Sequence, residues 1–262
     1  MPEDPSASLV LVSTAGPVTT VSLNRPAKRN ALCVELLSQL VAAVAAAEQD
    51  KSQRILILRG EGPAFCAGLD LVEAAVPERA HRSGELIAQC LRALSATPLV
   101  TIAAVHGAAI AGGAGLMTAC DIAVAAQGTQ IGYPETRRGL VAALVMTFLR
   151  RQLRERDARE LLLTGDLIDS ARALAIGLVN REVPAGELMT VAQAYADTVL
   201  RGGPEAVANT KRLFAELWPR PVLADLDRAQ AFHLEARQSS EAAEGIAAYR
   251  EKRPPNWLAG QG

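Results

Sequence analysis

Residues 99–125 read LVTIAAVHGAAIAGGAGLMTACDIAVA, and this stretch decides the fold class. Leu99–Val105 is a continuous apolar run behind Pro98, which predicts a buried strand. The glycine- and alanine-rich segment 107–115 predicts a loop that leads into a helix, and Asp121–Ala125 predicts the next strand. A strand, a helix and a further strand in this order indicate a layered α/β domain.

The flanking segments extend this alternation in both directions. Ser8–Val12 and Val18–Leu23 predict a hairpin, and Ile55–Leu58 predicts a buried strand followed by a loop over 60–68. From about residue 139 the pattern is mostly helical, apart from an extended segment at Leu178–Val183. The predicted helices cover about 31–49, 82–95, 157–163, 170–175, 187–200, 204–218, 222–236 and 240–250.

The composition excludes several function classes. The 262 residues carry 27 Lys+Arg against 28 Asp+Glu and only 3% aromatic residues, which argues against a nucleic-acid partner. No apolar run reaches the roughly 18–20 residues that span a bilayer, and the start MPEDPSAS has no signal-peptide pattern. We therefore expect a cytoplasmic protein without a membrane partner.

The cysteines and histidines do not predict a disulfide framework or a metal site. The four cysteines form no C-x-x-C pair, and the three histidines show no ligand spacing. The sequence also lacks complete nucleotide motifs, since the run from Gly113 misses the third glycine of G-x-G-x-x-G and no Gly-Lys-Ser/Thr follows Gly107.

Three segments carry candidate chemistry. The loop AFCAGLDL at 64–71 follows a predicted strand, and the segment 106–115 leaves backbone N–H groups that could bind an anion or an oxyanion. The segment GYPETRRGL at 132–140 places the Glu135 carboxylate in a loop before an apolar helix. The alternatives are close packing of small residues for the segment 106–115 and a small buried hydrophobic role for Cys66 in the loop 64–71. For Glu135 they are a helix cap or an ion pair with Arg137 or Arg138.

In this order and spacing, the segments resemble the crotonase (enoyl-CoA hydratase/isomerase) superfamily. The stretches that carry the resemblance are LNRPAKRNAL at 23–32, FCAGLDL at 65–71, residues 103–125, YPETRRGL at 133–140, RELLLTG at 159–165, GLVNREV at 177–183 and YREKRPPNW at 249–257. The resemblance implies a spiral of β-β-α turns over 1–195 and a helical oligomerisation region over 196–262. It implies homotrimers or hexamers that act on acyl-CoA or enoyl-CoA thioesters, with no cofactor because coenzyme A is part of the substrate.

The resemblance also assigns roles to residues of this chain. The backbone N–H groups of Leu69 and Gly112 would form the oxyanion hole, in which preorganised donors stabilise the enolate. Glu135 would be the catalytic acid/base. The residues implied in coenzyme A binding are Lys28, Arg29, Ala31, Ala64, Cys66, Ala67, Gly68 and Lys252.

The chain departs from the family pattern at the position of the first hydratase glutamate, which is Gly115 here. The position of the dienoyl-CoA isomerase acid is Ala143, and the usual Gly-Gly pair after the second glutamate is absent. A single carboxylate suits double-bond isomerisation, because one base can remove a proton and return it elsewhere. The alternatives are an enoyl-CoA hydratase that uses Glu135 alone and a catalytically weak acyl-CoA-binding paralogue.

Overall fold

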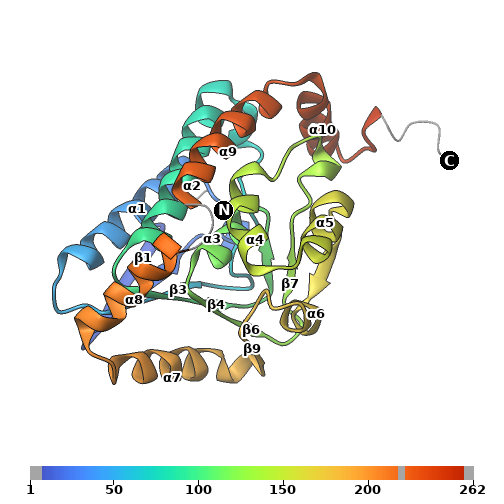
Figure 1. Ribbon diagram of the computed structural model, residues 1–262. Coiled ribbons are helices and arrows are strands. Elements are labelled where there is room, and N and C mark those ends of the chain that lie inside the picture. Colours follow the sequence, from blue (N-terminus) through green and yellow to red (C-terminus); the bar gives the residue numbers. More distant parts are fainter. Residues whose placement is uncertain (1–7, 218–221, 257–262) are drawn as a thin grey trace.

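A six-stranded sheet lies at the centre of the computed structural model, which describes residues 8–217 and 222–256 (Figure 1). In spatial order its strands are β1 (Val10–Ala15), β2 (Val18–Leu23), β3 (Ile55–Gly60), β4 (Val100–Val105), β6 (Ile122–Ala126) and β9 (Arg181–Val183). The β1–β2 hairpin is antiparallel and the other neighbours are parallel. A smaller sheet contains β5 (Ala108–Ile110), β7 (Gln130–Gly132) and β8 (Leu167–Asp169).

Successive segments of the chain repeat one winding pattern. β4 in the large sheet and β5 in the small sheet precede α3 (Gly112–Ala119), and β6 and β7 precede α4 (Ala143–Gln152). In two earlier turns an isolated bridge stands in the place of the second strand. These bridges are Leu32 to Leu69, before α1 (Val34–Gln49), and Cys66 to Ala109, before α2 (Pro77–Ala96). The β-β-α spiral confirms the predicted fold class.

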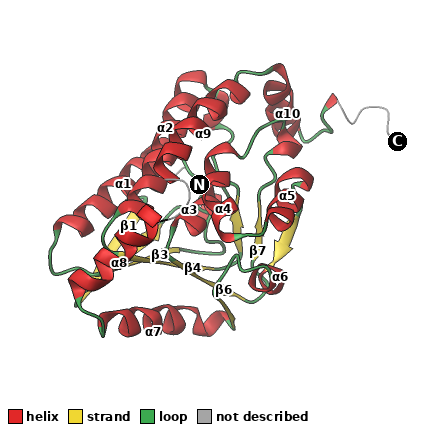
Figure 2. Cartoon of the chain, in the orientation of Figure 1, coloured by secondary structure: helices red, strands yellow, loops and turns green. Residues whose placement is uncertain are grey.

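The two faces of the large sheet bury alternating residues of the central strands. Ile55 and Ile57 of β3 pack on the side of α7 (Leu188–Leu200), whereas Leu56 and Leu58 pack with α1 and α2 on the opposite side (Figure 2). Because both faces are covered, these strands are continuous apolar runs. This is the reason that they could be recognised from the sequence.

The remaining helices follow α4 in the chain. They are α5 (Glu155–Thr164), α6 (Ser170–Ala175), α8 (Pro204–Leu217), α9 (Val222–Arg237) and α10 (Ser240–Glu251). α9 packs against α2 and α4, and α10 packs against the 3-10 turn Thr136–Arg138. Parts of three stretches used in the sequence analysis lie outside the described residues: residues 1–7 of the start MPEDPSAS, Trp218 at the end of the helix predicted over 204–218, and Trp257 at the end of YREKRPPNW.

Several sequence expectations were wrong in detail. After residue 139 the segment Leu178–Val183 is not the only extended one, because β8 forms at Leu167–Asp169. The segment 107–115 is not a continuous loop, because residues 108–110 form β5 and α3 begins at Gly112. This short strand depends on distant partners: the Ile110 N–H donates to the Cys66 carbonyl, and the Ala111 N–H donates to the Gly132 carbonyl. In addition, α2 begins five residues earlier than expected, at Pro77, a residue that suits a first helical turn.

None of the helices in residues 8–217 and 222–256 is both long and apolar enough to cross a membrane.

Candidate active site

A cavity of about 90 Å³ lies between the loop after β3, the start of α3, the turn after β7 and helix α9. It brings together the sequence-predicted residues Leu69, Gly112 and Glu135, which are up to 66 residues apart in the chain. Its lining residues are Ala67, Leu69, Leu71, Ile87, Ile110, Ala111, Gly112, Glu135, Arg138, Leu140, Val141, Ala142, Ala143, Leu144, Val145, His233 and Tyr249. The cavity is therefore mainly apolar, with few polar groups.

The backbone N–H groups of Leu69 and Gly112, two residues of the cavity lining, donate no hydrogen bond to the described residues. Gly112 is the first residue of α3, and within the described residues the helical bonding starts only with the Gly115 N–H, which donates to the Ala111 carbonyl at 2.9 Å. The preceding residue, Ala111, has φ 51° and ψ −118°, a strained conformation for a residue with a side chain. This backbone turn directs the chain from β5 into the N-terminus of α3, where anionic oxygens are favoured.

The loop that carries Leu69 is held by residues that the sequence analysis did not single out. Asn30 is fully buried, and its Nδ2 donates to the carbonyls of Glu61 and Ala64 at 2.9 and 2.8 Å. Its Oδ1 accepts from the Arg25 N–H at 2.8 Å. Its φ of 55° is tolerated better by asparagine than by most residues. Asn30 lies within the stretch 23–32 that carries the family resemblance, but nothing in that stretch distinguishes this residue as the one that holds the loop.

Asp70, next to Leu69, forms a mostly buried ion pair with Arg25 at 2.7 Å. Its Oδ1 also accepts from the backbone N–H of Val72 at 3.0 Å. Burial by itself would raise the pKa of Asp70, but the hydrogen bond from Arg25 and the backbone donors hold it below its ordinary value. Asp70 therefore stays ionised and stabilises the loop.

Glu135 follows β7 and is the carboxylate in the cavity lining. Its Oε2 is buried and accepts no hydrogen bond from the described residues. Burial raises the pKa of Glu135 to about 7, against smaller lowering effects of its own backbone N–H and of Arg138. A carboxyl group with a pKa near 7 is present in both protonation states at neutral pH, which suits a group that takes up and returns a proton.

The turn after Glu135 packs against helix α10. The guanidinium carbon of Arg138 lies 5.0 Å from the centre of the Tyr249 ring on α10. Leu140 packs in a small cluster with Ala242 and Ile246 of the same helix. Contacts of α10 therefore stabilise the segment that follows Glu135.

The position of the missing carboxylate, Gly115, is filled by a neighbouring side chain. A Cβ atom built at Gly115 would lie 2.3 Å from Cγ1 of Val145 on α4 and 3.2 Å from its Cβ. A further 3.7 Å contact would form with Leu91. The space for a second acidic side chain is therefore occupied by a valine that itself lines the cavity.

A more open groove of about 510 Å³ adjoins the cavity and shares Ala67, Ile110, Arg138 and Tyr249 with it. Its lining contains four arginines: Arg29, Arg137, Arg138 and Arg253. Arg137 pairs with Asp166, and Arg253 pairs with Glu244 at 2.7 Å, while Arg29 forms no ion pair with the described residues. Because Arg137 and Arg253 are paired with carboxylates, the positive charges that the groove can offer an anionic ligand are those of Arg29 and Arg138.

The structure places the other residues implied in coenzyme A binding as follows. Arg29 and Ala67 line the groove, but Lys28 and Lys252 are not among its lining residues. The side chains of Ala64 and Cys66 are fully buried. The Cys66 N–H donates to the Ala108 carbonyl at 2.9 Å, and the Leu32 N–H donates to the Gly68 carbonyl at 2.8 Å. The Ala31 carbonyl accepts from the Arg25 guanidinium at 3.2 Å.

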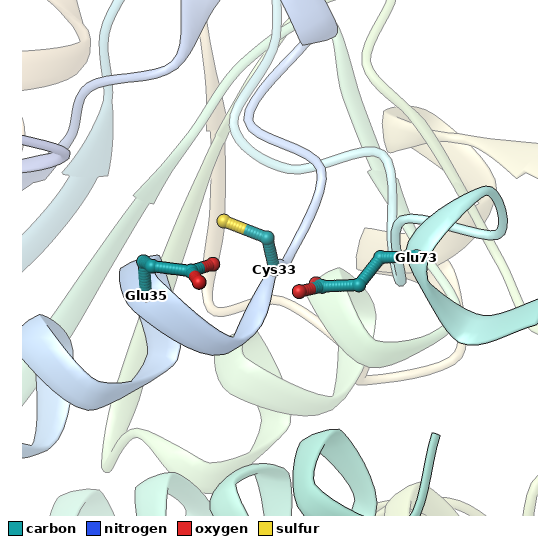
Figure 3. Close-up of side chains that lie close together, drawn as sticks. All are labelled: Cys33, Glu35 and Glu73. Carbon is teal, nitrogen blue, oxygen red and sulfur yellow. The ribbon is translucent and has the colours of Figure 1, made fainter. Parts of the chain in front are cut away.

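One group of metal-ligand atoms occurs elsewhere in the described residues. The ligand atoms of Cys33, Glu35 and Glu73 lie within 4.8 Å of one another (Figure 3). Arg79 pairs with both carboxylates, and Glu73 accepts from the Val34 N–H at 2.9 Å, at the start of α1. Burial raises the pKa of the Cys33 thiol. The arrangement fits a helix cap with a bridging arginine, and we assign no metal to it.

Comparisons with known proteins define the class of this protein. The family model described as enoyl-CoA hydratase/isomerase matches residues 13–260. The chain therefore belongs to the enoyl-CoA hydratase/isomerase family, which is a family of enzymes, and the predicted crotonase resemblance is confirmed.

Individual relatives are similar over nearly their whole length. A Thermus thermophilus protein named "Putative enoyl-CoA hydratase" is 39% identical over 248 residues, which cover 92% of this chain and 98% of the relative. The mitochondrial enoyl-CoA hydratase domain-containing protein 2 of Bos taurus is 37% identical over 93% of this chain and 86% of its own. The crystal structure of an enoyl-CoA hydratase from Mycobacterium avium matches with a TM-score of 0.84 and 35% identity, and covers 96% of this chain and 99% of that one.

Proposed function

We propose that this enzyme moves the double bond of 3-enoyl-CoA thioesters to the 2-position, with Glu135 as its single acid/base. The observation that carries the proposal is the Val145 side chain in the space beside Gly115, since it leaves no room for the second carboxylate that would hold water. The raised pKa of Glu135, about 7, supports the same role.

In the proposed reaction the Glu135 carboxylate removes a proton from C2 of the 3-enoyl group. The electron pair of the broken C–H bond enters a dienolate, whose oxygen accepts hydrogen bonds from the N–H groups of Leu69 and Gly112. The Glu135 carboxyl then returns the proton to C4, and the double bond between C2 and C3 forms. No proton or electron is gained or lost overall, so the reaction needs no cofactor and no bound water.

The coenzyme A moiety would occupy the arginine-lined groove. Arg29 is the residue we assign to its phosphates, because it lines the groove without an ion pair among the described residues and guanidinium groups pair well with phosphate oxygens. Ala67 would lie beside the pantetheine, since it lines both the groove and the cavity.

The test is the Glu135→Gln variant on a 3-enoyl-CoA substrate, with the product identified by chromatography and mass. We expect kcat to fall by about 10²–10⁴-fold, as is typical when a general acid/base is lost. Glu160→Gln is the matched control, because Glu160 lies on α5 with a 62% exposed side chain. An unchanged rate in Glu135→Gln would refute the role of this residue.

Hydration of 2-enoyl-CoA by Glu135 alone is the second candidate, and it is favoured by the names of the relatives. A substrate panel separates the two reactions, because a hydratase forms 3-hydroxyacyl-CoA and an isomerase does not. Tight binding of enoyl-CoA without turnover of either substrate would instead indicate the acyl-CoA-binding paralogue.

We also retain the proposals that residues 196–262 form an oligomerisation region, that the protein is a trimer or hexamer, and that it is cytoplasmic. The family membership supports the first two. Light scattering of the purified protein measures the assembly directly, and a monomer would contradict them.

A further inference from the structure

His233 on α9 is a polar residue of the cavity for which the proposed reaction has no use. Its side chain lines the cavity that contains Glu135, and the residue is only 9% exposed. Its Nε2 is buried and has no hydrogen-bond partner among the described residues. A buried ring nitrogen without a hydrogen bond costs free energy. An unpaired nitrogen in a cavity lining therefore indicates that a bound ligand supplies its hydrogen-bond partner.

The neighbouring helix accommodates this ring. Gly84 lies inside α2, where glycine is unfavourable relative to alanine. A Cβ atom at Gly84 would lie 3.2 Å from Cδ2 and 3.3 Å from Nε2 of His233, closer than side chains normally pack. The glycine therefore leaves room for the imidazole edge that carries the unpaired nitrogen.

The charge state of His233 is set by its surroundings. Burial, together with the nearby Arg237 charge, lowers the pKa of His233 to about 4, so the ring is neutral at pH 7. A neutral imidazole donates a hydrogen bond from one nitrogen and accepts one at the other, and the tautomer adapts to its partner. The cavity wall also contains apolar side chains such as Leu71, Ile87 and Leu144, which offer no alternative partner.

We propose that His233 is a specificity residue whose Nε2 forms a hydrogen bond with a neutral oxygen on the acyl chain of the substrate, a hydroxyl or a keto group. The pocket then selects an oxygenated acyl group over a plain alkyl group of equal length. The reason is that only the oxygenated ligand pairs the buried nitrogen, and a site built to pair with a ligand oxygen discriminates strongly against its absence. The inference rests on the proposed function only in placing the acyl chain in this cavity.

The experiment measures binding rather than turnover, so that it is independent of the reaction. Saturated acyl-CoA thioesters of one chain length, either plain or carrying a hydroxyl group, a keto group or a terminal carboxylate, are titrated calorimetrically into the wild-type protein, His233→Leu and His233→Gln. We expect the wild type to bind the best hydroxylated thioester at least about tenfold more tightly than the plain one. His233→Leu should bring this ratio close to one without weakening the plain ligand, and His233→Gln should retain part of it, because its amide can still form the bond.

Several results would overturn the proposal. One is an equal affinity of the wild type for hydroxylated and plain ligands, which would mean that water or nothing pairs Nε2. Another is an unchanged ratio in His233→Leu. Tightest binding of an acyl-CoA with a terminal carboxylate would contradict the neutral oxygen. If acyl-CoA binds as expected but no enoyl-CoA is converted, the proposed isomerisation fails and the role of His233 stands.

Discussion

The replacement of Gly115 by alanine tests whether Val145 fills the space of the missing carboxylate. The added Cβ atom would lie 2.3 Å from Val145 Cγ1, a distance at which one of the two helices or the valine must move. Valine is branched at Cβ and has little rotamer freedom in a helix, so a simple side-chain rotation gives limited relief. We therefore expect the two positions to be strongly coupled.

The magnitude follows from three terms. Overpacking of a buried site costs about 1–3 kcal/mol. Exchange of glycine for alanine within a helix returns about 1 kcal/mol, so Gly115→Ala should destabilise the wild type by up to about 2 kcal/mol. The Val145→Ala variant lacks the clash. This substitution itself lowers the free energy of unfolding by about 1.6 kcal/mol for two buried methyl groups plus a cavity term. The same Gly115→Ala change should there stabilise the protein by about 1 kcal/mol.

The assay is urea unfolding of the wild type, both single variants and the double variant, at one fixed protein concentration because assembly affects stability. The expected coupling free energy is about 1–3 kcal/mol, equal to the overpacking term that Val145→Ala removes, and the Gly115→Ala effect should change sign between the two backgrounds. Additivity of the two changes within about 0.5 kcal/mol would refute the reasoning, because residues that do not touch behave in this way.

Three further predictions concern Glu135 and Asn30. Since Glu135 must be ionised to accept a proton and its pKa is about 7, kcat/KM for a 3-enoyl-CoA should rise with pH up to about 7 and level off above it; a flat profile from pH 5 to 8 would contradict the assignment. The same raised pKa makes the wild type less stable as pH rises from 4.5 to about 7, because the carboxyl releases its proton at lower pH in the unfolded chain than in the folded one. Glu135→Gln does not titrate, so its free energy of unfolding relative to the wild type should increase by up to about 3 kcal/mol between pH 4.5 and pH 8. Thermal or urea unfolding at both pH values checks this, and an equal difference at the two would count against it. Asn30→Ala should cost about 3–5 kcal/mol in the free energy of unfolding, because it leaves buried carbonyls unpaired and places alanine at φ 55°; a loss below about 1 kcal/mol in urea would show that the loop does not depend on this side chain.

The predictable part of the fold consists of elements with a strong local pattern. Buried strands such as Ile55–Gly60 and Val100–Val105 are continuous apolar runs, and α1 shows helical spacing of its buried residues. The strand Ala108–Ile110 was missed because three residues are too few to show a period. Its partners are far away in the chain, since Ile110 bonds to Cys66 and the following Ala111 bonds to Gly132. Short strands of this kind are decided by their partners rather than by their own residues.

For the site, the sequence by itself determined the chemical groups: a carboxylate at 135, glycine-rich turns that expose N–H groups, and the absence of an acid at 115. These are properties of individual residues, so they can be read before the chain is folded. Only the tertiary structure decided that Val145 fills the space beside Gly115, that Asn30 holds the loop of Leu69, and that His233 enters the cavity. Each of these depends on contacts between segments 30 or more residues apart, and packing at such contacts has no local signature in the sequence.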